Sequence, residues 1–129
     1  MKSISINSKV HTEFINIDSY INEFINESKI INSILTIFIP HTTAGITINE
    51  NADPDVTSDM RVILDRMVPW EGNYDHFEGN SAAHIKASMM GNSLQIIIEN
   101  SKIKLGTWQS IYLCEFDGPR IRTVWIKEN

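Results

Sequence analysis

Apolar and polar residues alternate at the beginning of the chain, where Ile4 and Ile6 stand two positions apart. Side chains two positions apart share one face of a β-strand, so this pattern predicts a strand over residues 3–10. β-Branched and aromatic residues are dense at 33–39 and resume at 46–48 after a short polar break. These two segments are therefore predicted to be strands on either side of a polar connection.

Apolar residues at helical spacing follow Asp18, whose side chain is suited to an N-cap, and they predict an amphipathic surface helix. A second helix is predicted to begin at Asp53-Pro54, because aspartate can accept free amide N–H groups and proline has its φ already set. Its apolar stripe consists of Val56, Met60, Ile63, Leu64 and Met67. A short third helix is predicted over 82–90. Residues 70–82 show no apolar period, which is typical of a functional or mobile loop.

Alternation returns in the last third of the chain and predicts strands near residues 94–98, 103–105, 111–116 and 121–126. Turn residues connect them, so a mainly antiparallel C-terminal sheet is expected. Strands outnumber helices and cluster toward the end, which favours an α+β fold over a βαβ alternation. With 129 residues, 42% of them hydrophobic, the chain is expected to form a single domain over 1–129, with a core that needs no structural metal.

Charge and cysteine content narrow the class of protein. Eleven Lys and Arg against sixteen Asp and Glu give a net charge of −5, which opposes the positive field on which non-specific nucleic-acid binding depends. The N-terminus lacks the apolar segment of a secretory signal, and the densest apolar run ends at Pro40, short of the ~20 residues that span a bilayer. The single Cys114 lies in an apolar strand and is expected to be a buried residue. We expect a cytoplasmic, soluble protein that binds neither nucleic acid nor membranes.

Three of the four histidines, His41, His76 and His84, lie in polar or loop-like segments. Neutral imidazoles bind zinc and similar divalent ions, and three protein ligands leave a fourth position open for catalysis. The spacing of His76 and His84 matches no local metal motif, so structural or surface roles remain the alternative. If all three bind one ion, the loop at 70–82 must fold back over the strand that precedes His41. Zinc is the first candidate, with manganese, nickel and magnesium as alternatives.

Polar groups that could serve chemistry gather at two further places. Glu50 and Asp53 bring carboxylates to a strand-to-helix junction, where Asp53 is expected to cap the helix and Glu50 is free for proton transfer. Thr42 and Thr43 could present hydroxyl groups to an anion, and positive charge is available from Lys86, Arg120 and Arg122. The chain has no phosphate-loop lysine motif, dinucleotide glycine fingerprint or serine-nucleophile elbow.

Four segments, at residues 41–54, 83–88, 106–109 and 113–115, together resemble the YjbQ family, also called the secondary thiamine-phosphate synthase enzymes. The resemblance implies an α+β domain, a mainly antiparallel sheet or β-sandwich with two principal helices and a short third. It also implies a homotrimer whose sites contain His41, His76 and His84. The chain departs from the family pattern at Ile97, where proline is common, and at Ser101 and Ser110, where glycine is common.

The activity associated with the family joins a hydroxymethylpyrimidine diphosphate to a thiazole phosphate, releasing pyrophosphate. The resemblance therefore implies a metal-dependent enzyme that acts on a small anionic or phosphorylated substrate. Catalytic candidates are Glu50 and Glu115, and substrate-binding candidates are Thr42, Thr43, Asn49, Lys86, Gln109 and Arg120. Two alternatives remain open. One is a metal hydrolase in which Glu50 or Glu115 is the general base, and the other is a non-catalytic binding or assembly protein.

Overall fold

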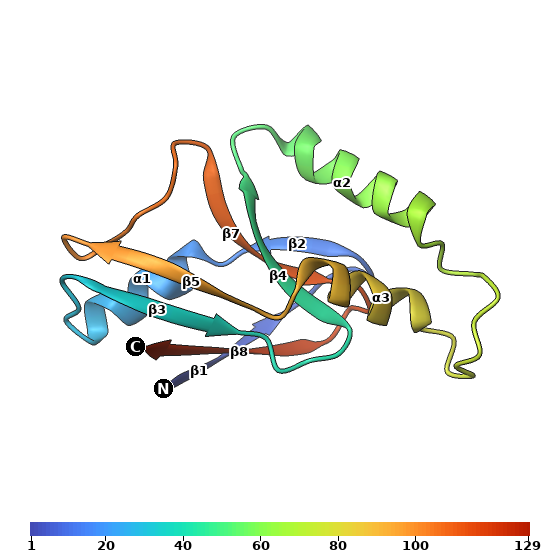
Figure 1. Cartoon of the computed structure of the whole chain (residues 1–129), viewed down its shortest axis with the longest axis horizontal. Coiled ribbons are helices and arrows are strands. Elements are labelled where there is room, and N and C mark those ends of the chain that lie inside the picture. Colours follow the sequence, from blue (N-terminus) through green and yellow to red (C-terminus); the bar gives the residue numbers. More distant parts are fainter.

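A computed structural model describes residues 1–129 and contains three helices and eight strands (Figure 1). The strands are β1 (Lys2–Asn7), β2 (Glu13–Asn16), β3 (Ser33–Phe38), β4 (Ala44–Glu50), β5 (Ser93–Glu99), β6 (Lys102–Ile103), β7 (Gln109–Glu115) and β8 (Ile121–Glu128). The helices are α1 (Asp18–Glu27), α2 (Pro54–Met67) and α3 (Ser81–Met90). The predicted α+β class is confirmed, and so are all three predicted helices, although α3 has ten residues, as many as α1.

The strands form two antiparallel sheets. One sheet has five strands in the order β1-β8-β3-β5-β6, and the other has three in the order β2-β7-β4. The prediction of one C-terminal sheet was wrong in its pairing, because β7 joins the smaller sheet while β5, β6 and β8 join the larger. Strand β2 was not predicted at all. Turn residues mark where strands end, but they do not specify which distant strand each one pairs with.

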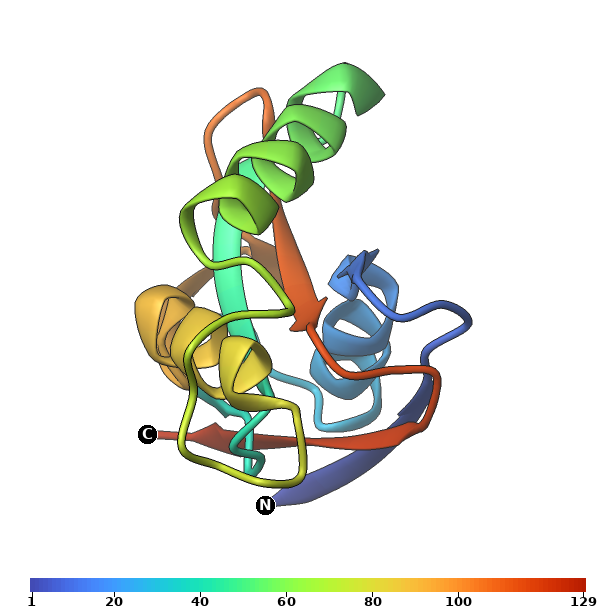
Figure 2. The ribbon, with the colours of Figure 1, turned by 90° about the vertical axis from the view of Figure 1, so that its right-hand side faces the viewer.

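Alternating isoleucines place the main core between the two sheets. Ile37 and Ile126 point inward from the larger sheet, Ile46 and Ile111 do so from the smaller one, and Ile21 of α1 closes the side. The other face of the smaller sheet is covered by α2 and α3 through a second cluster of Leu64, Ala83, Ala87, Cys114 and Phe116. Cys114 is a buried, free cysteine, as predicted. The smaller sheet is thus a middle layer, and Figure 2 shows α2 (green) standing farthest from the larger sheet.

Of the two predicted N-cap residues, one was correct and the other was wrong. Asp53 caps α2 as predicted, and its Oδ1 accepts the backbone N–H of Asp55 at 2.9 Å. Asp18 does not cap α1, because it is already the first helical residue. Its Oδ1 instead accepts the backbone N–H of Ile111 at 2.9 Å, which ties α1 to β7. None of the three helices is long and apolar enough to cross a membrane.

Glycine in place of Ser101 is expected to stabilise the protein. Asn100 and Ser101 connect β5 to β6 with φ values of 53° and 61°, in the left-handed region where a Cβ is strained and glycine is not. Relief of a strain of ~1–2 kcal/mol outweighs the extra chain entropy that glycine loses on folding, so Ser101→Gly should raise the free energy of unfolding by about 0.5–1 kcal/mol. Urea unfolding measures the change. Ser33→Gly in β3 is the matched control and should lower stability, and a loss in both variants would contradict the turn argument.

Candidate functional site

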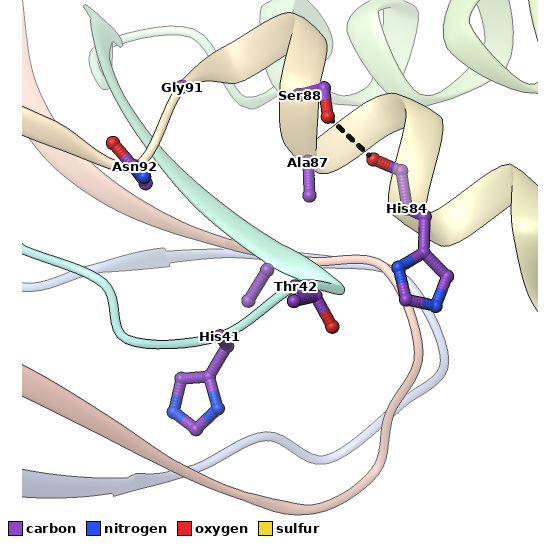
Figure 3. A pocket seen from close by; sticks show the side chains of 8 residues that line it. His41, Thr42, His84, Ala87, Ser88, Gly91 and Asn92 are labelled. Carbon is purple, nitrogen blue, oxygen red and sulfur yellow. Dashed lines mark hydrogen bonds between the residues drawn. The ribbon is translucent and has the colours of Figure 1, made fainter.

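A cavity of about 470 Å³ opens between the start of β4 and helix α3. It is lined on one side by the segment between β3 and β4, which carries His41 and Thr42, and on the other by His84 of α3 and the turn that follows it (Figure 3). The backbones approach closely here, since the Ile46 N–H donates to the carbonyl of Gly91 at 3.0 Å. The other residues that line the cavity are Ala44, Ala87, Ser88, Gly91 and Asn92.

A second cavity of about 400 Å³ adjoins the first, and both are lined by His41, Thr42 and Asn92. It extends toward β8 and is lined there by Arg120 and Arg122. Each volume lies in the range of small-molecule sites. We call the two together the histidine–arginine cleft. It brings together four predicted site residues, His41, Thr42, Thr43 and Arg120, and has the predicted His84 at its far end.

His41 is held by the backbone of β8. Its Nε2 accepts the N–H of Thr123 at 2.8 Å. The pairing of β3 with β8 ends at Phe38 and Trp125, so Thr123 lies beyond it. The ring therefore takes the place of a missing strand partner. Burial lowers the pKa of His41 below its usual value, and the nearby positive charge of Arg122 adds to the effect. The imidazole is neutral at pH 7, with its proton on Nδ1.

His76 and His84 lie next to each other. Their ring centroids are 5.5 Å apart with the rings perpendicular, and His76 Nε2 lies 3.6 Å from the carboxylate of Glu78. However, the Nε2 lone pair of His41 is occupied by Thr123, and no group of three His, Cys, Asp or Glu side chains in the chain is placed to hold a metal ion. The residues of one chain therefore do not fit the predicted three-histidine site in this arrangement.

Replacing His41 by glutamine should reduce the loss of stability at low pH. Because the pKa of His41 in the folded state lies below 6.5, the unfolded chain takes up this proton first as the pH falls. The stability contributed by neutral His41 is complete above pH 6.5 and declines as the pH falls toward the folded-state pKa. In His41→Gln the amide oxygen can still accept the Thr123 N–H but does not titrate. Urea unfolding of both proteins between pH 8 and 5 measures the effect, and the free energy of unfolding should fall less in the variant than in the wild type. Equal falls in the two proteins would contradict the assignment.

A buried ion pair stands behind the cleft. Arg122 is 2% exposed and Glu115 is 0% exposed, and the guanidinium donates from Nε to both carboxylate oxygens at 2.9 and 3.0 Å. Ser8 and the backbone N–H of Asp117 also donate to Glu115. Burial raises the pKa of Glu115, but these hydrogen bonds outweigh it and hold the pKa below its usual value. Thr43 accepts from Arg122 Nη2. Within one chain, Glu115 is thus a structural anion without an oxygen free for substrate.

Lys86 lies outside the cleft. Its side chain is 3% exposed, its ammonium group is paired with Asp65 of α2, and it lies 6.0 Å from the centre of the Phe116 ring. This pair connects α3 to α2. Arg120 reaches the cleft wall while its guanidinium contacts the Asp117 carboxylate at 3.1 Å. Among the predicted cationic residues, the structure therefore brings Arg120 and Arg122 to His41 and leaves Lys86 outside the cleft.

Asn49, Glu50 and Gln109 lie at the opposite end of β4 from His41. Glu50 pairs with Gln109 at the last register position, whereas Ala44 at the first position lines the cleft. A seven-residue strand is about 20 Å long, so these three residues cannot contact a small ligand bound beside His41 of the same chain. The predicted site residues thus divide into two groups at the two ends of one strand.

Two cleft residues were missed or underestimated by sequence reasoning. Asn92 gave no signal, because it reaches the site through the turn between α3 and β5, whose position only the tertiary structure shows. Arg122 was considered for its charge alone. Its position in the strand was informative, since Arg122 lies on the same face of β8 as the buried Val124 and Ile126. A cation at an inward strand position predicts a buried partner.

The layered fold and the cleft define a class of protein, an α+β sandwich with histidines and arginines gathered where α3 crosses the smaller sheet. The chain belongs to the family described as UPF0047 protein YjbQ-like, whose family model matches residues 2–128. The resemblance noted in the sequence is therefore confirmed over nearly the whole chain.

Several relatives match over almost their full length. The UPF0047 protein YugU of Bacillus subtilis is 51% identical, with 98% of this chain and 97% of YugU covered. YjbQ of Escherichia coli is 36% identical, with 88% of this chain and 85% of that protein covered. A crystal structure of a YjbQ/UPF0047 family protein from Clostridium acetobutylicum has a TM-score of 0.97 at 54% identity and full coverage of both chains. A Thermus thermophilus protein has a TM-score of 0.94 at 33% identity, also with full coverage.

Proposed function

We propose that this protein is an enzyme acting on a small phosphorylated substrate in the histidine–arginine cleft, with thiamine-phosphate synthesis as the reaction to test. The observation that carries the proposal is the cleft itself, where His41, whose pKa is lowered, lies with Thr42, Arg120 and Arg122 around the cavity next to β8. Charged and polar hydrogen-bond donors in a partly enclosed cleft stabilise developing negative charge.

The chemistry of this reaction suits such a site. A hydroxymethylpyrimidine diphosphate loses pyrophosphate from a methylene carbon, and the thiazole nitrogen forms the new bond to that carbon. The aminopyrimidine ring stabilises the positive charge that develops on the carbon, so no protein nucleophile is required. The protein is needed to bind both reactants and to stabilise the leaving pyrophosphate, which are roles for hydrogen-bond donors and cations.

An assay with both thiamine precursors tests the proposed reaction. Purified protein should form thiamine phosphate above a protein-free reaction, and His84→Gln should reduce the rate because His84 lines the cleft. The matched control is His11→Gln, since His11 is exposed and contacts Thr12 and Trp70 away from the cleft. If the wild type forms no thiamine phosphate, this reaction is abandoned, and if it instead releases a water-derived product, the hydrolase alternative replaces it.

A divalent ion, zinc first, remains part of the proposal. One chain supplies the adjacent His76 and His84, and a complete site needs a further ligand from another subunit or from a His41 that has released Thr123. Metal analysis of protein purified without chelator, together with activity before and after dialysis against a chelator, tests this dependence. Full activity in protein free of metal would remove the ion from the proposed mechanism.

We further propose that the protein assembles as a homotrimer. The apolar stripe of α2 is partly uncovered in one chain: Ile63 is 46% and Met67 is 63% exposed, and only Leu64 of this helix is buried. Sedimentation should give three times the chain mass of 14.7 kDa. A monomer at micromolar concentration would contradict the proposal.

A cytoplasmic location is proposed from the single, unpaired Cys114.

A further inference from the structure

Arg122 has one terminal nitrogen that the fold does not use. Its Nε donates to Glu115, and its Nη2 donates to the hydroxyl of Thr43 at 2.8 Å and to the Thr43 carbonyl at 3.1 Å. Nη1 donates to no group of the chain. The one buried side-chain polar atom without a partner is Asn80 Oδ1, so Nη1 must reach solvent although Arg122 is almost fully buried. The arginine is one of the residues that line the histidine–arginine cleft.

The direction of Nη1 is fixed by the groups behind it. Glu115 holds one edge of the planar guanidinium, accepting from both Nε and Nη2, and Thr43 also accepts from Nη2. Ser8 and the Asp117 backbone in turn orient the carboxylate. A guanidinium that is already fixed loses little side-chain entropy when a ligand binds, and it keeps its charge at every physiological pH. The two Nη1 protons are therefore preorganised donors at the wall of the cleft.

Further donors surround the same space. Because Nε2 of His41 accepts the Thr123 N–H, the neutral ring carries its proton on Nδ1 and has a donor left over. Arg120 lines this part of the cleft with a second guanidinium, and Thr42 and Asn92 add a hydroxyl and an amide. Nearby carboxylates are already engaged, Glu115 by Arg122 and Asp117 by Arg120 and Asn80. A ligand that supplies several acceptor oxygens would match this set, which is the chemistry of a phosphoryl group.

We infer that Arg122 is a substrate-binding residue, whose Nη1 donates to a phosphoryl oxygen of the substrate in the part of the cleft next to β8. The remainder of the substrate then extends past His41 and Thr42 toward His84. This assignment rests on the proposed function and makes it more specific, because it places the pyrophosphate group at Arg122. It also gives the buried ion pair a second role, which is to aim one guanidinium nitrogen into the cleft.

Titration of the wild-type protein with inorganic pyrophosphate, followed by ¹H–¹⁵N NMR, tests the site without any substitution. The signals of the Arg122 Nε–H, the Thr123 amide and the Asn92 side-chain amide should shift together and saturate. Signals from α2 should remain in place. Sodium chloride at the same ionic strength is the control and should not reproduce these shifts. Pyrophosphate that shifts other signals but not these three would overturn the assignment, as would shifts equal to those with sodium chloride.

Arg122→Lys supplies the second measurement, because lysine can keep the charge next to Glu115 but has no Nη1. Loss of one charge-assisted hydrogen bond should weaken pyrophosphate binding about 10- to 100-fold. Arg61→Lys, at an exposed arginine of α2, is the matched control and should bind pyrophosphate as the wild type does. Circular dichroism establishes whether each variant is folded. If Arg122→Lys does not fold, the wild-type titration alone decides.

The two experiments separate this inference from the proposed reaction. Pyrophosphate bound at Arg122 by a protein without thiamine-phosphate synthase activity would support the phosphoryl site and reject the reaction. Synthase activity in a protein whose Arg122 and Thr123 signals do not respond to pyrophosphate would support the reaction and reject the site. A folded Arg122→Lys variant with wild-type affinity for pyrophosphate would also reject it.

Discussion

Replacing Glu115 by alanine is expected to lower the free energy of unfolding by about 3–5 kcal/mol, because the substitution leaves Arg122 charged and buried without its partner. Ser8 and the Asp117 N–H lose their acceptor in the same variant. Denaturant unfolding followed by circular dichroism measures the loss. The effect reaches the candidate site as well, since β8 presents the Thr123 N–H to His41 directly after Arg122.

Glu78→Ala is the matched control for this prediction. The Glu78 carboxylate lies 3.6 Å from His76 Nε2, but its side chain is 62% exposed, and exposed pairs contribute about 0–1 kcal/mol. The pH dependence gives an independent check, because the pKa of Glu115 is lower in the folded state. The stability that Glu115 contributes is complete above the usual glutamate pKa, and it declines as the pH falls through the pKa of Glu115 in the folded state. Equal losses in Glu115→Ala and Glu78→Ala would show that the buried pair does not stabilise the fold.

Valine in place of Gly45 is expected to separate α3 from β4 and to lower the free energy of unfolding by about 1–3 kcal/mol or more. A Cβ at this position would lie 2.8 Å from the Gly91 carbonyl oxygen and 3.0 Å from Met90 Cβ. Both are parts of the turn that ends α3, and a backbone oxygen cannot move aside as a side chain can. Because His84 is carried by α3, the distance between His84 and His41 should increase.

Thermal unfolding and ligand binding together measure this effect. Gly106→Ala is a suitable control, since the atom that its Cβ would meet, at 3.1 Å, is the end of the flexible Gln109 side chain. The control should cost much less stability. A Gly45→Val protein with wild-type stability would show that α3 can shift freely on β4, and the cleft would then not depend on this contact.

The sequence by itself determined the elements and the inward faces of most of them. Alternating apolar residues specified β1, β5 and β8, because one buried face of a strand requires apolar residues at every second position, and a dense run of β-branched and aromatic residues specified β3. Asp53-Pro54 specified the start of α2 through local hydrogen bonding and a fixed φ. The apolar stripe of α2 was also correct as a helix pattern, although Ile63 and Met67 are exposed in one chain.

The tertiary structure decided the pairing of the strands and the composition of the site. Sheet order depends on contacts between segments as distant as β1 and β8, and a local pattern carries no information about which segments meet. For the same reason the candidate residues divided as they did. His41 and His84 share a cleft, Glu50 lies at the far end of β4, and Glu115 is paired with a buried arginine. Residue type indicated which groups can do chemistry, whereas long-range packing decided which of them are neighbours and which still have free atoms.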